Sequence, residues 1–469
     1  MPLILGTNSI KATGYDVANS CRFNDGDSPK MSKDATSGTN ITVATISLWC
    51  KRGALATDVI IFSGNYKTNV NYYCFLKFRS DDKLMFTNYD AGTNCEYQTN
   101  RLFRDPSAWY HICVRCDLGE DEDDRVKNYV NGVQATSFST ETAMTGDQFF
   151  LGKSGYEINV SNREDASYFD GYLAEVVYID GTSYAPTSFG EFDEDSPTIW
   201  KPIDVSGLTF GTNGFYLDFE ASDNLGNDAN GGTDLDETNL AAADQATDTP
   251  TNNFATWNPL NVPTSNAPVF DEGNVNLASA ADAAEFTGTS TIGVTNGKWY
   301  AEFKNTAGSY CIVGITSNPG EDARNNVRPG TYTTSWGYNA SGSGEVQNNN
   351  SGITYTCDSW TTNDIIGVYI DCDNSKLYFA KNGTVQNSGT GISLVSGDTY
   401  FFTQGDGDNS SGSTHAANFG GCPAFAVSSA VADTNSYGSF EYDPSAGTFD
   451  SASKDFLALC TKNLGSDGG

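Results

Sequence analysis

The sequence is poor in several residue types that common functions require. Histidine occurs only 2 times in 469 residues, so we expect no histidine-based metal centre. Basic residues number 26 against 59 acidic residues, for a net charge of −33. A surface this acidic repels the phosphates of nucleic acids and of anionic membranes, so neither is an expected partner. A Gly-x-Ser-x-Gly motif, which would offer a serine nucleophile, is also missing.

Long apolar runs are missing as well. No stretch approaches the roughly 20 residues that a membrane-spanning helix needs, and we expect no membrane insertion. The first residues, MPLILGT, have no basic region, so we expect no signal peptide. The 11 cysteines are an odd number without a framework spacing, and most lie in apolar strand patterns. This usage indicates mainly reduced thiols in a protein that folds in a cytoplasm.

The clearest positive signal is the alternation of apolar and polar residues. Residues 360–383 read WTTNDIIGVYIDCDNSKLYFAKNG, which is typical of a strand, a turn and a second strand. Asn382-Gly383 at its end suits the positive φ angles of a tight hairpin. One face of the first strand is apolar and is formed by Ile366, Val368, Ile370 and Cys372.

The first half of the chain has the same pattern. It alternates in residues 45–50 (TISLWC), 109–117 (WYHICVRCD) and 171–180 (GYLAEVVYID), and Asn131-Gly132 predicts another hairpin. The predicted inward face of the second run is Tyr110, Ile112, Val114 and Cys116. The fold class that follows is all-β, with two antiparallel β-sandwich domains; their jelly-roll or lectin-like type is implied by the resemblances described below.

A loop-rich, extended connector is expected between the two sandwiches. Residues 223–244 are rich in Asp, Asn, Gly and Ala, and such a segment has little apolar area to offset the entropy of ordering. The predicted boundaries are an N-terminal arm (1–19), a first sandwich (20–200), the connector (201–265), a second sandwich (266–425) and a C-terminal extension (426–469).

Both predicted sandwiches resemble known families. GKWYAEF at 297–303, the run at 360–383 and NFG at 418–420 together resemble a SPRY domain, which implies partner-binding loops without catalytic activity. TISLW at 45–49, with Trp109, His111 and the Asn131-Gly132 hairpin, resembles a laminin-G-like, concanavalin A-like jelly roll. That resemblance implies a lectin-like domain, and some members of the family hold calcium at the rim of the sandwich.

The chain as a whole resembles virion proteins of tailed phages, many of them from marine phages. The motifs that carry this resemblance are DGYLAEV at 170–176, FGEFD at 189–193, GTNGFYLDF at 211–219, DTPTNNF at 248–254 and FLALCTKNL at 456–464. It implies a tail-fibre, appendage or capsid-surface protein that is assembled in the host cytoplasm. The implied partners are other virion proteins of the tail or capsid, and further copies of the chain in a homo-oligomer.

Three functions are compatible with these features. The first is a non-enzymatic adhesin that binds a glycan or receptor on the host surface. The second is a capsid-decoration or tail-bracing protein without a host ligand. The third is a glycan depolymerase that uses the carboxylates of EFDED at 191–195, with Glu191 as the candidate to replace by glutamine. We favour the adhesin, because the acidic run lies between Gly190 and Pro197 at a domain edge and ends in Asp rather than Glu.

Candidate binding residues lie in loops. Trp336 and Tyr338 stand in the Gly/Ser/Asn-rich stretch 331–351, and Asp406 and Asp408 stand in GDGDN, so these four are the predicted ligand-binding residues. Calcium is the one cofactor that the acidic loops predict, because hard cations prefer several oxygen ligands in a yielding loop. Its predicted ligands are Asp117, Asp121, Asp223 and Asp228. For His111 we expect a packed or hydrogen-bonded strand histidine rather than a catalytic pair with Cys113.

Overall fold

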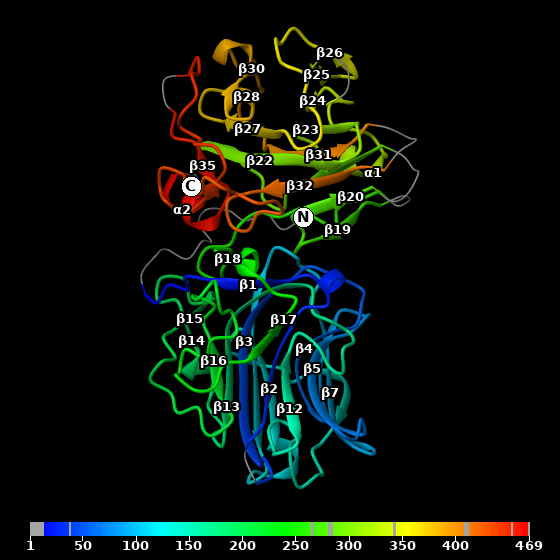
Figure 1. The fold of residues 1–469 in the computed structure, drawn as a ribbon, viewed down its shortest axis with the longest axis vertical. Helices are drawn as coiled ribbons and strands as arrows, with labels where there is room; N and C mark the ends of the chain where they lie inside the picture. The colour runs from blue at the N-terminus through cyan, green and yellow to red at the C-terminus, as the bar shows by residue number, and fades with distance from the viewer. Residues whose placement is uncertain are drawn as a thin grey trace. The chain divides into compact units, whose positions relative to one another are not determined.

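The structure is a computed structural model that describes residues 14–36, 39–263, 267–279, 285–340, 344–407, 412–451 and 454–467. The chain divides into two compact units, one ending at Thr251 and the other beginning at Asn252 (Figure 1). Both units are built from antiparallel sheets, so the all-β fold predicted from the alternation is confirmed. No helix within the described ranges is long and apolar enough to cross a membrane.

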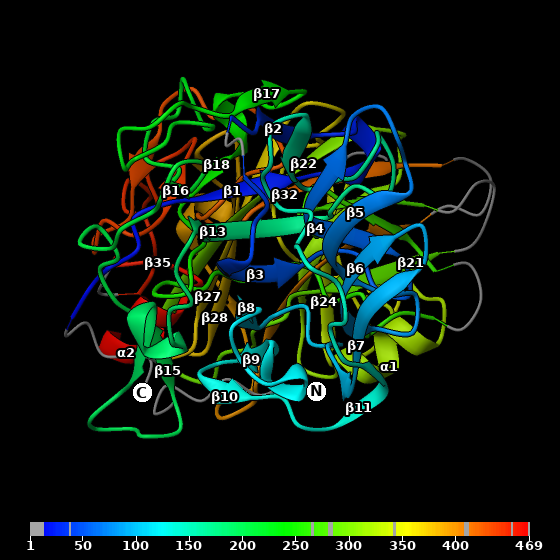
Figure 2. The same cartoon turned by 90° about the horizontal axis from the view of Figure 1, so that it is seen from below.

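The first unit is a sandwich of two sheets, which we name after their central strands β8 and β5 (Figure 2). The order of the β8 sheet is β10 (Val133–Gln134), β9 (Val126–Val130), β8 (Trp109–Asp117), β3 (Val43–Arg52), β13 (Gly171–Asp180), β1 (Ser20–Phe23) and β18 (Gln245–Ala246), with β16 (Phe215–Leu217) also on β13. The order of the β5 sheet is β11 (Phe138–Thr142), β7 (Thr93–Leu102), β6 (Lys83–Asp90), β5 (Tyr72–Phe78), β4 (Val59–Tyr66), β12 (Tyr156–Val160), β2 (Lys30–Asp34) and β17 (Asp236–Thr238).

The core of the first unit lies between these two sheets. Tyr110, Ile112, Val114 and Cys116 of β8 all point into it, so the predicted inward face is confirmed. The residues between them point to the other face of the sheet. His111 and Cys113 are also buried and Arg115 is half-buried, because the chain returns over that face after β13.

We name residues 184–217 the first cover, because this segment lies on the outer face of the β8 sheet before its last strand, β16, joins that sheet beside β13. It contains the short helix η4 (Pro186–Ser188) and the hairpin of β14 (Gly190–Phe192) with β15 (Trp200–Pro202). Its apolar side chains form a second cluster with residues of β8 and β13, namely Cys113, Val177, Ile179, Phe189, Val205, Phe210 and Tyr216. Strands β3, β8 and β13 are therefore buried on both faces, which explains why polar residues in them have lost contact with solvent.

The predicted connector differs from the structure. Most of it belongs to the first unit, because β16 pairs with β13, β17 with β2 and β18 with β1. Of the three leucines in its acidic part, Leu225 and Leu235 are buried in the first core and Leu240 packs against it. Side-chain bonds hold the rest in place; for example, Arg22 forms an ion pair of 3.2 Å with Asp244 of η5 (Ala242–Asp244). Composition alone underestimates how ordered such a segment is, because hydrogen bonds and ion pairs here replace much of the apolar burial.

The second unit is also a sandwich, whose sheets we name after β22 and β31. The order of the β22 sheet is β19 (Val269–Asp271), β20 (Asn276–Ala278), β32 (Thr414–Asn418), β22 (Lys298–Ala307), β27 (Ile365–Asp371), β28 (Lys376–Lys381) and β29 (Thr384–Val385), with β30 (Ile392–Ser393) on β28 and β35 (Leu457–Ala458) on β22. The order of the β31 sheet is β21 (Phe286–Thr289), β31 (Phe401–Asp406), β23 (Cys311–Thr316), β24 (Ser335–Asn339), β25 (Glu345–Asn348) and β26 (Ser351–Gly352).

The core of the second unit confirms the strand face predicted in β27. Ile366, Val368 and Ile370 are buried in it, with Cys372 packed beside them. The opposite face of the β22 sheet carries Tyr300 and Tyr369, and it is buried as well.

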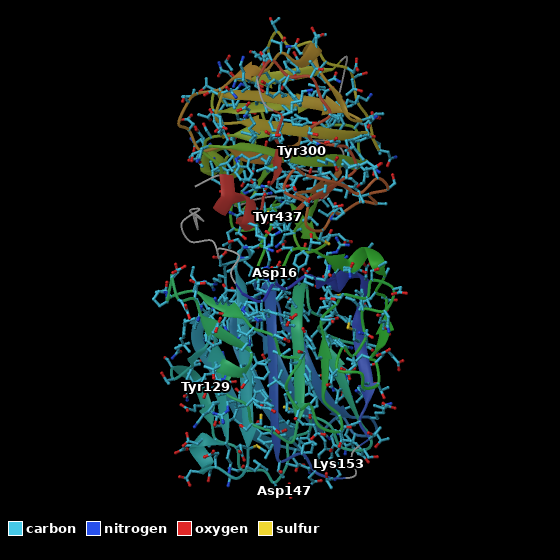
Figure 3. All side chains as sticks on the ribbon, turned by 90° about the vertical axis from the view of Figure 1, so that its left-hand side faces the viewer. Asp16, Tyr129, Asp147, Lys153, Tyr300 and Tyr437 are labelled. Atoms are coloured by element: carbon cyan, nitrogen blue, oxygen red, sulfur yellow. The ribbon has the colours of Figure 1, made fainter. Side chains whose placement is uncertain are left out.

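The segment that buries this opposite face is part of the predicted C-terminal extension. We name residues 433–451 and 454–460 the second cover, which places Phe440, Phe449 and Phe456 against the tyrosines of the sheet. Tyr300 on the sheet and Tyr437 in the cover are labelled in Figure 3. The remaining short elements are η2 (Asp25–Asp27), η3 (Glu122–Asp124), η6 (Asn387–Gly389), α1 (Pro319–Arg324), β33 (Val431–Ala432), β34 (Ser439–Phe440) and α2 (Thr461–Asp467).

Candidate functional site

Two of the predicted ligand-binding residues belong to the core. Trp336 and Tyr338 are 7% and 0% exposed, respectively, and both point into the second core from β24. The prediction that they lie in an exposed loop is therefore wrong. The Gly/Ser/Asn-rich composition around them suggested a loop, but Trp336-Gly337-Tyr338 alternates with the period of a strand, and that strand pairs with β23.

Asp406 is also an interior residue, at the end of β31. Its carboxylate accepts a hydrogen bond of 2.5 Å from the Ser413 hydroxyl, which lies 2.6 Å from Nε2 of His415. Nδ1 of His415 lies 2.9 Å from Sγ of Cys311, and burial lowers the pKa of His415 to about 3 and raises that of Cys311. These groups form a buried polar chain with a neutral histidine and a protonated thiol, so we assign them no ligand contact. Asp408 lies outside the described residues.

The predicted calcium ligands are not gathered at one place. Asp117 accepts the backbone N–H of Gly119 at 2.8 Å, and Asp121 is the residue just before η3. Within the described ranges, no group of three or more His, Cys, Asp or Glu side chains could hold a metal ion.

The second predicted calcium loop is organised around Asp228. This residue is buried and accepts the backbone N–H of Tyr216 at 3.0 Å and that of Asn230 at 3.1 Å. Asp223, by contrast, is exposed. Calcium binding stays a prediction of the sequence, and the structure gives Asp228 the role of closing a loop.

His111 is hydrogen-bonded through both ring nitrogens under the first cover. The indole N–H of Trp200 donates to Nδ1 at 3.0 Å, and Nε2 lies 2.9 Å from the Ser47 hydroxyl. Because an indole can only donate, Nδ1 is the acceptor and the proton of the neutral ring sits on Nε2. Burial lowers the pKa of His111 to about 3 and raises that of Cys113 to about 12. The expectation of a hydrogen-bonded strand histidine is confirmed.

The carboxylates proposed for a depolymerase surround a cation. Lys201 Nζ lies 3.4 Å from a carboxylate oxygen of Glu191 and 3.4 Å from one of Asp193. Asp193 also accepts the backbone N–H groups of Asp195 and Ser196, both at 3.0 Å, so it closes a turn. Of Glu191, Asp193 and Asp195, only Glu191 lies on strand β14. These carboxylates therefore close a turn and neutralise Lys201.

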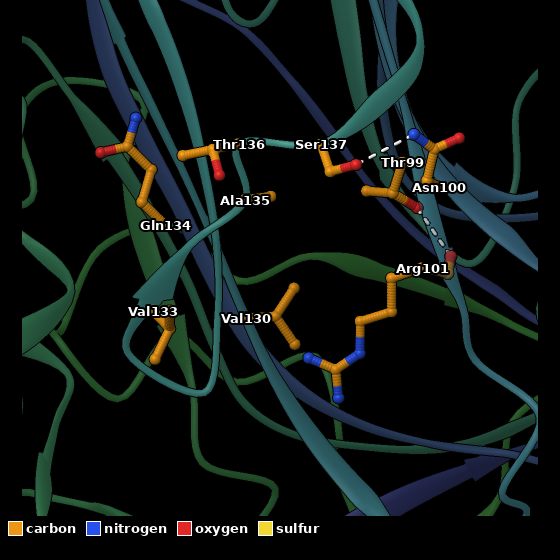
Figure 4. Close-up of a pocket in the computed structure, with 9 residues that line it drawn as sticks. All are labelled: Thr99, Asn100, Arg101, Val130, Val133, Gln134, Ala135, Thr136 and Ser137. Atoms are coloured by element: carbon orange, nitrogen blue, oxygen red, sulfur yellow. Dashed lines mark hydrogen bonds between the residues drawn. The ribbon is translucent and has the colours of Figure 1, made fainter.

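The structure contains a pocket that the sequence did not predict. After the β9–β10 hairpin the chain leaves the edge of the β8 sheet, passes through residues 135–137 and enters β11 at the edge of the β5 sheet (Figure 2). The pocket lies beside this passage and has a volume of about 210 Å³. We name it the crossover pocket; its lining residues are Thr99, Asn100, Arg101, Val130, Val133, Gln134, Ala135, Thr136 and Ser137 (Figure 4).

Two hydrogen bonds fix the wall of the crossover pocket. The backbone N–H of Asn100 donates to the carbonyl of Ser137 at 3.0 Å, and the Asn100 side-chain amide donates to the Ser137 hydroxyl at 2.9 Å (Figure 4). On the far side of the hairpin, a Cβ on Gly132 would lie 2.3 Å from the ring of Trp200. The hairpin is therefore held against the first cover, and the crossover is held against β7.

The electrostatics of the pocket contrast with those of the chain. None of its nine lining residues is acidic, and one of them is Arg101. The guanidinium of Arg101 lies 5.1 Å from the ring centroid of Phe103 and 5.8 Å from that of Tyr110. The pocket thus joins hydroxyl, amide and guanidinium groups to an apolar floor that includes Val130.

Sequence analysis missed these residues for a physical reason. β7 and the crossover come from separate parts of the chain, and they meet only because β11 pairs with β7 in the register Phe138↔Thr99. The one local signal is the polar run that directly follows the predicted Asn131-Gly132 hairpin.

Comparison with known families assigns both domains. Residues 25–183 match the concanavalin A-like lectin/glucanases superfamily, and residues 298–404 match the SPRY domain. The first unit therefore contains a concanavalin A-like domain and the second contains a SPRY domain. Domains of both types are typically binding domains. A search of curated proteins finds no match to the chain.

Solved structures also match parts of the chain. The SPRY domain of human HERC1 is 19% identical, and the match covers 36% of this chain and 99% of that one with a TM-score of 0.28. A native heptameric SAP-like pentraxin from Limulus polyphemus is 15% identical, and the match covers 37% of this chain and 80% of that one with a TM-score of 0.25.

Proposed function

We propose that this protein is a non-enzymatic adhesin of a tailed-phage virion, which binds a glycan on the host surface through the crossover pocket. The observation that carries the proposal is this pocket, lined by polar and apolar groups and placed on a concanavalin A-like domain. The motifs shared with phage virion proteins, such as 170–176 and 456–464, support the virion context.

The chemistry of the pocket suits a sugar. A monosaccharide presents several hydroxyl groups around a ring with C–H faces, so it needs donors, acceptors and a small apolar surface. Ser137, Asn100 and Gln134 offer the polar groups, and Val130 and Val133 offer the apolar surface. A single shallow site of this kind binds weakly, and repeated copies on a virion turn weak binding into avidity.

The candidate acids support binding rather than hydrolysis. A glycosidase needs two carboxyl groups placed on either side of the scissile bond. Glu191 and Asp193 instead share Lys201. We therefore expect the protein to bind a host polysaccharide without releasing reducing ends.

The direct test is to fill the pocket. We would titrate the full chain with an array of host polysaccharides and repeat the measurement with Ala135→Trp, which places a ring among the lining residues. The matched control is Val70→Trp, at a position of the same unit that is 60% exposed and outside the pocket lining. Loss of binding in the first variant alone supports the proposal. Absence of glycan binding by the wild-type chain, or equal binding by both variants, would overturn it.

The virion context needs its own test. We would label intact parent particles with antibody against the second unit and locate the gold by electron microscopy. Gold at fibre or tail tips supports the adhesin. Gold spread over the capsid supports a decoration protein instead, and the absence of gold contradicts a virion protein with this unit exposed.

A further inference from the structure

Arg101 is a cation of the first unit whose charge faces the crossover pocket instead of a carboxylate. The buried and half-buried cations nearby are paired: Lys51 lies 2.7 Å from Asp248, and Arg52 lies 3.2 Å from Asp82. Arg101 is exposed, and within the described part of the chain its guanidinium contacts rings and no carboxylate.

The guanidinium is also held in place. It lies over Phe103 and Tyr110, which are both buried and whose rings meet edge to face at 5.2 Å. Stacking occupies the face of a guanidinium and leaves its in-plane N–H groups free to donate. The two rings restrict the positions that this exposed side chain can take, which lowers the entropy cost of binding a ligand.

We propose that the crossover pocket selects an anionic sugar of the uronic acid class, whose carboxylate is bound by Arg101. This inference rests on the proposed function and names the class of its ligand. The geometry favours a carboxylate because its two oxygens match two parallel N–H groups of a guanidinium. The remaining groups suit the rest of the sugar: the Ser137 hydroxyl accepts from Asn100, so its proton is free for a ligand oxygen, and Val130 and Val133 face the ring.

The local charge supports this choice. A ligand with a negative charge is repelled by the chain as a whole, and salt screens that repulsion over about 10 Å. Within the pocket the balance is reversed, because the lining holds one arginine and no acid. The pocket thus discriminates by charge at short range, where the guanidinium and the carboxylate are in contact.

The test compares a charged sugar with its neutral form. We would titrate the full chain, by calorimetry at moderate salt, with trimers of galacturonate, glucuronate and mannuronate and with their methyl esters. A trisaccharide that carries sulfate groups but no carboxylate is titrated as a second kind of anion. We expect at least one uronate to bind about tenfold or more tightly than its ester, because a charge-assisted bidentate contact is lost on esterification.

Three variants sharpen the test. Arg101→Gln should weaken uronate binding about tenfold or more while leaving ester binding unchanged. The uronate affinity of Arg101→Lys should lie between those of the wild type and Arg101→Gln, because lysine keeps the charge but lacks the two parallel N–H groups of the guanidinium. The control is Arg104→Gln, since Arg104 is 56% exposed, pairs with Asp82 and lies outside the pocket lining. Thermal unfolding shows whether each variant is folded.

The outcomes separate this inference from the proposed function. Equal affinity for uronate and ester, or an equal loss for both in Arg101→Gln, overturns the inference while the glycan-binding function stands. Tighter binding of the sulfated sugar than of every uronate overturns the assignment to carboxylates. A wild-type chain that binds none of these sugars and no neutral polysaccharide overturns both proposals.

Discussion

Both units contain the same local feature, an Asn-Gly hairpin, but the path of the chain after that hairpin differs between them. Each has an Asn-Gly hairpin whose asparagine holds the neighbouring strand. The Oδ1 of Asn131 accepts the N–H of His111 at 2.8 Å, and that of Asn382 accepts the N–H of Ile365 at 2.9 Å. Each asparagine also donates its own N–H to the carbonyl of the same neighbouring residue, at 2.9 Å and 2.8 Å, respectively.

The glycine of each hairpin packs against its cover. A Cβ on Gly132 would lie 2.3 Å from the Trp200 ring, and one on Gly383 would lie 2.6 Å from the Tyr442 ring. The units diverge after the hairpin. In the first unit the chain crosses to the other sheet and forms the wall of the crossover pocket, whereas in the second it returns as β30 to the same sheet. The pocket therefore follows from the path of the chain and not from the hairpin.

Each cover is also fastened by a buried glutamate, and replacing Glu302 of the second unit should have the largest effect. Glu302 accepts the backbone N–H groups of residues 441 and 442 at 2.9 Å and 2.8 Å, and it also binds Tyr300 and Asn418. Glu302→Ala leaves two backbone donors without an acceptor, so we expect it to lower the free energy of unfolding of the second unit by about 4 kcal/mol.

Replacing Glu175 of β13, which fastens the first cover, should have a smaller effect on stability. Glu175 is bound by the hydroxyls of Tyr15 and Tyr216, which also lie 3.0 Å from one another. After Glu175→Ala the hydroxyls can still bond to each other, so we expect a loss of about 2 kcal/mol. Denaturant unfolding of the full chain, followed by tryptophan fluorescence, measures both. Equal losses would show that the nature of the donors does not matter.

Replacing the hairpin glycines should destabilise the protein as much as Glu175→Ala or more, in a fixed order. Gly132, Gly383 and the control position Gly181 all have positive φ, which alanine adopts at a cost of about 1 kcal/mol. Gly132→Ala also meets the buried ring of Trp200, and we expect a loss of about 3 kcal/mol. Gly383→Ala meets the half-buried ring of Tyr442, which can move, and we expect about 2 kcal/mol.

The control for the ring contacts is Gly181→Ala, because a Cβ there meets nothing within 4 Å. We expect it to cost only the about 1 kcal/mol of its backbone conformation. Thermal unfolding of the three variants gives the order. If Gly181→Ala costs as much as Gly132→Ala, the rings of the covers do not constrain the hairpins.

The same glutamates should make stability depend on pH. Burial raises the pKa of Glu175 and of Glu302 to about 7. A raised pKa means that the folded state holds the proton more tightly than the unfolded state, so the contribution is complete below pH 4.5 and is lost as pH rises through 7. Between pH 6 and pH 8 we expect each glutamate to lower the free energy of unfolding by about 1 kcal/mol.

The two buried histidines act in the opposite direction and must be separated out. Burial lowers their pKa to about 3, so they destabilise the folded state as pH falls below 6.5. Both are unchanged in Glu175→Gln and Glu302→Gln, so the difference between wild type and each variant isolates the glutamate. A difference that does not vary between pH 6 and pH 8 would contradict the raised pKa values.

The smallest expected effect lies on the first cover. Glu191 is mostly exposed, and its ion pair with Lys201 is of the kind that contributes little. We expect Glu191→Gln to change the free energy of unfolding by less than about 0.5 kcal/mol and to leave glycan binding unchanged. Release of reducing sugar by the wild type, and its loss in this variant, would instead establish a depolymerase.

Much of the fold could be predicted where strand alternation is strict. Ile366, Val368 and Ile370 face a core as predicted, and both Asn-Gly hairpins are present, because these features depend on local sequence. Trp336 was misplaced because the composition of its neighbourhood outweighed a short alternating run. The role of the covers was not predicted, since burial of a second sheet face depends on segments far away in the chain.

The candidate site was less predictable than the fold. Arg101 and Ser137 come together only through the pairing of two edge strands, and the charge of one residue does not reveal whether a carboxylate lies beside it. Asp406 was chosen for its glycine-rich setting, but it belongs to a buried chain of polar groups. Binding sites built at sheet edges require the register of the strands, which a sequence does not specify.

The thiols of this protein can report, through their alkylation, when each unit opens. All 11 cysteines carry thiols that are not in disulfides, and all are buried except Cys357 and Cys372, which are half-buried. Six precede Asn252 and five follow it, so each unit holds its own set. An alkylating reagent reaches a buried sulfur only when the surrounding unit opens. The masses of the modified peptides would therefore show which unit opens first, without any engineered label.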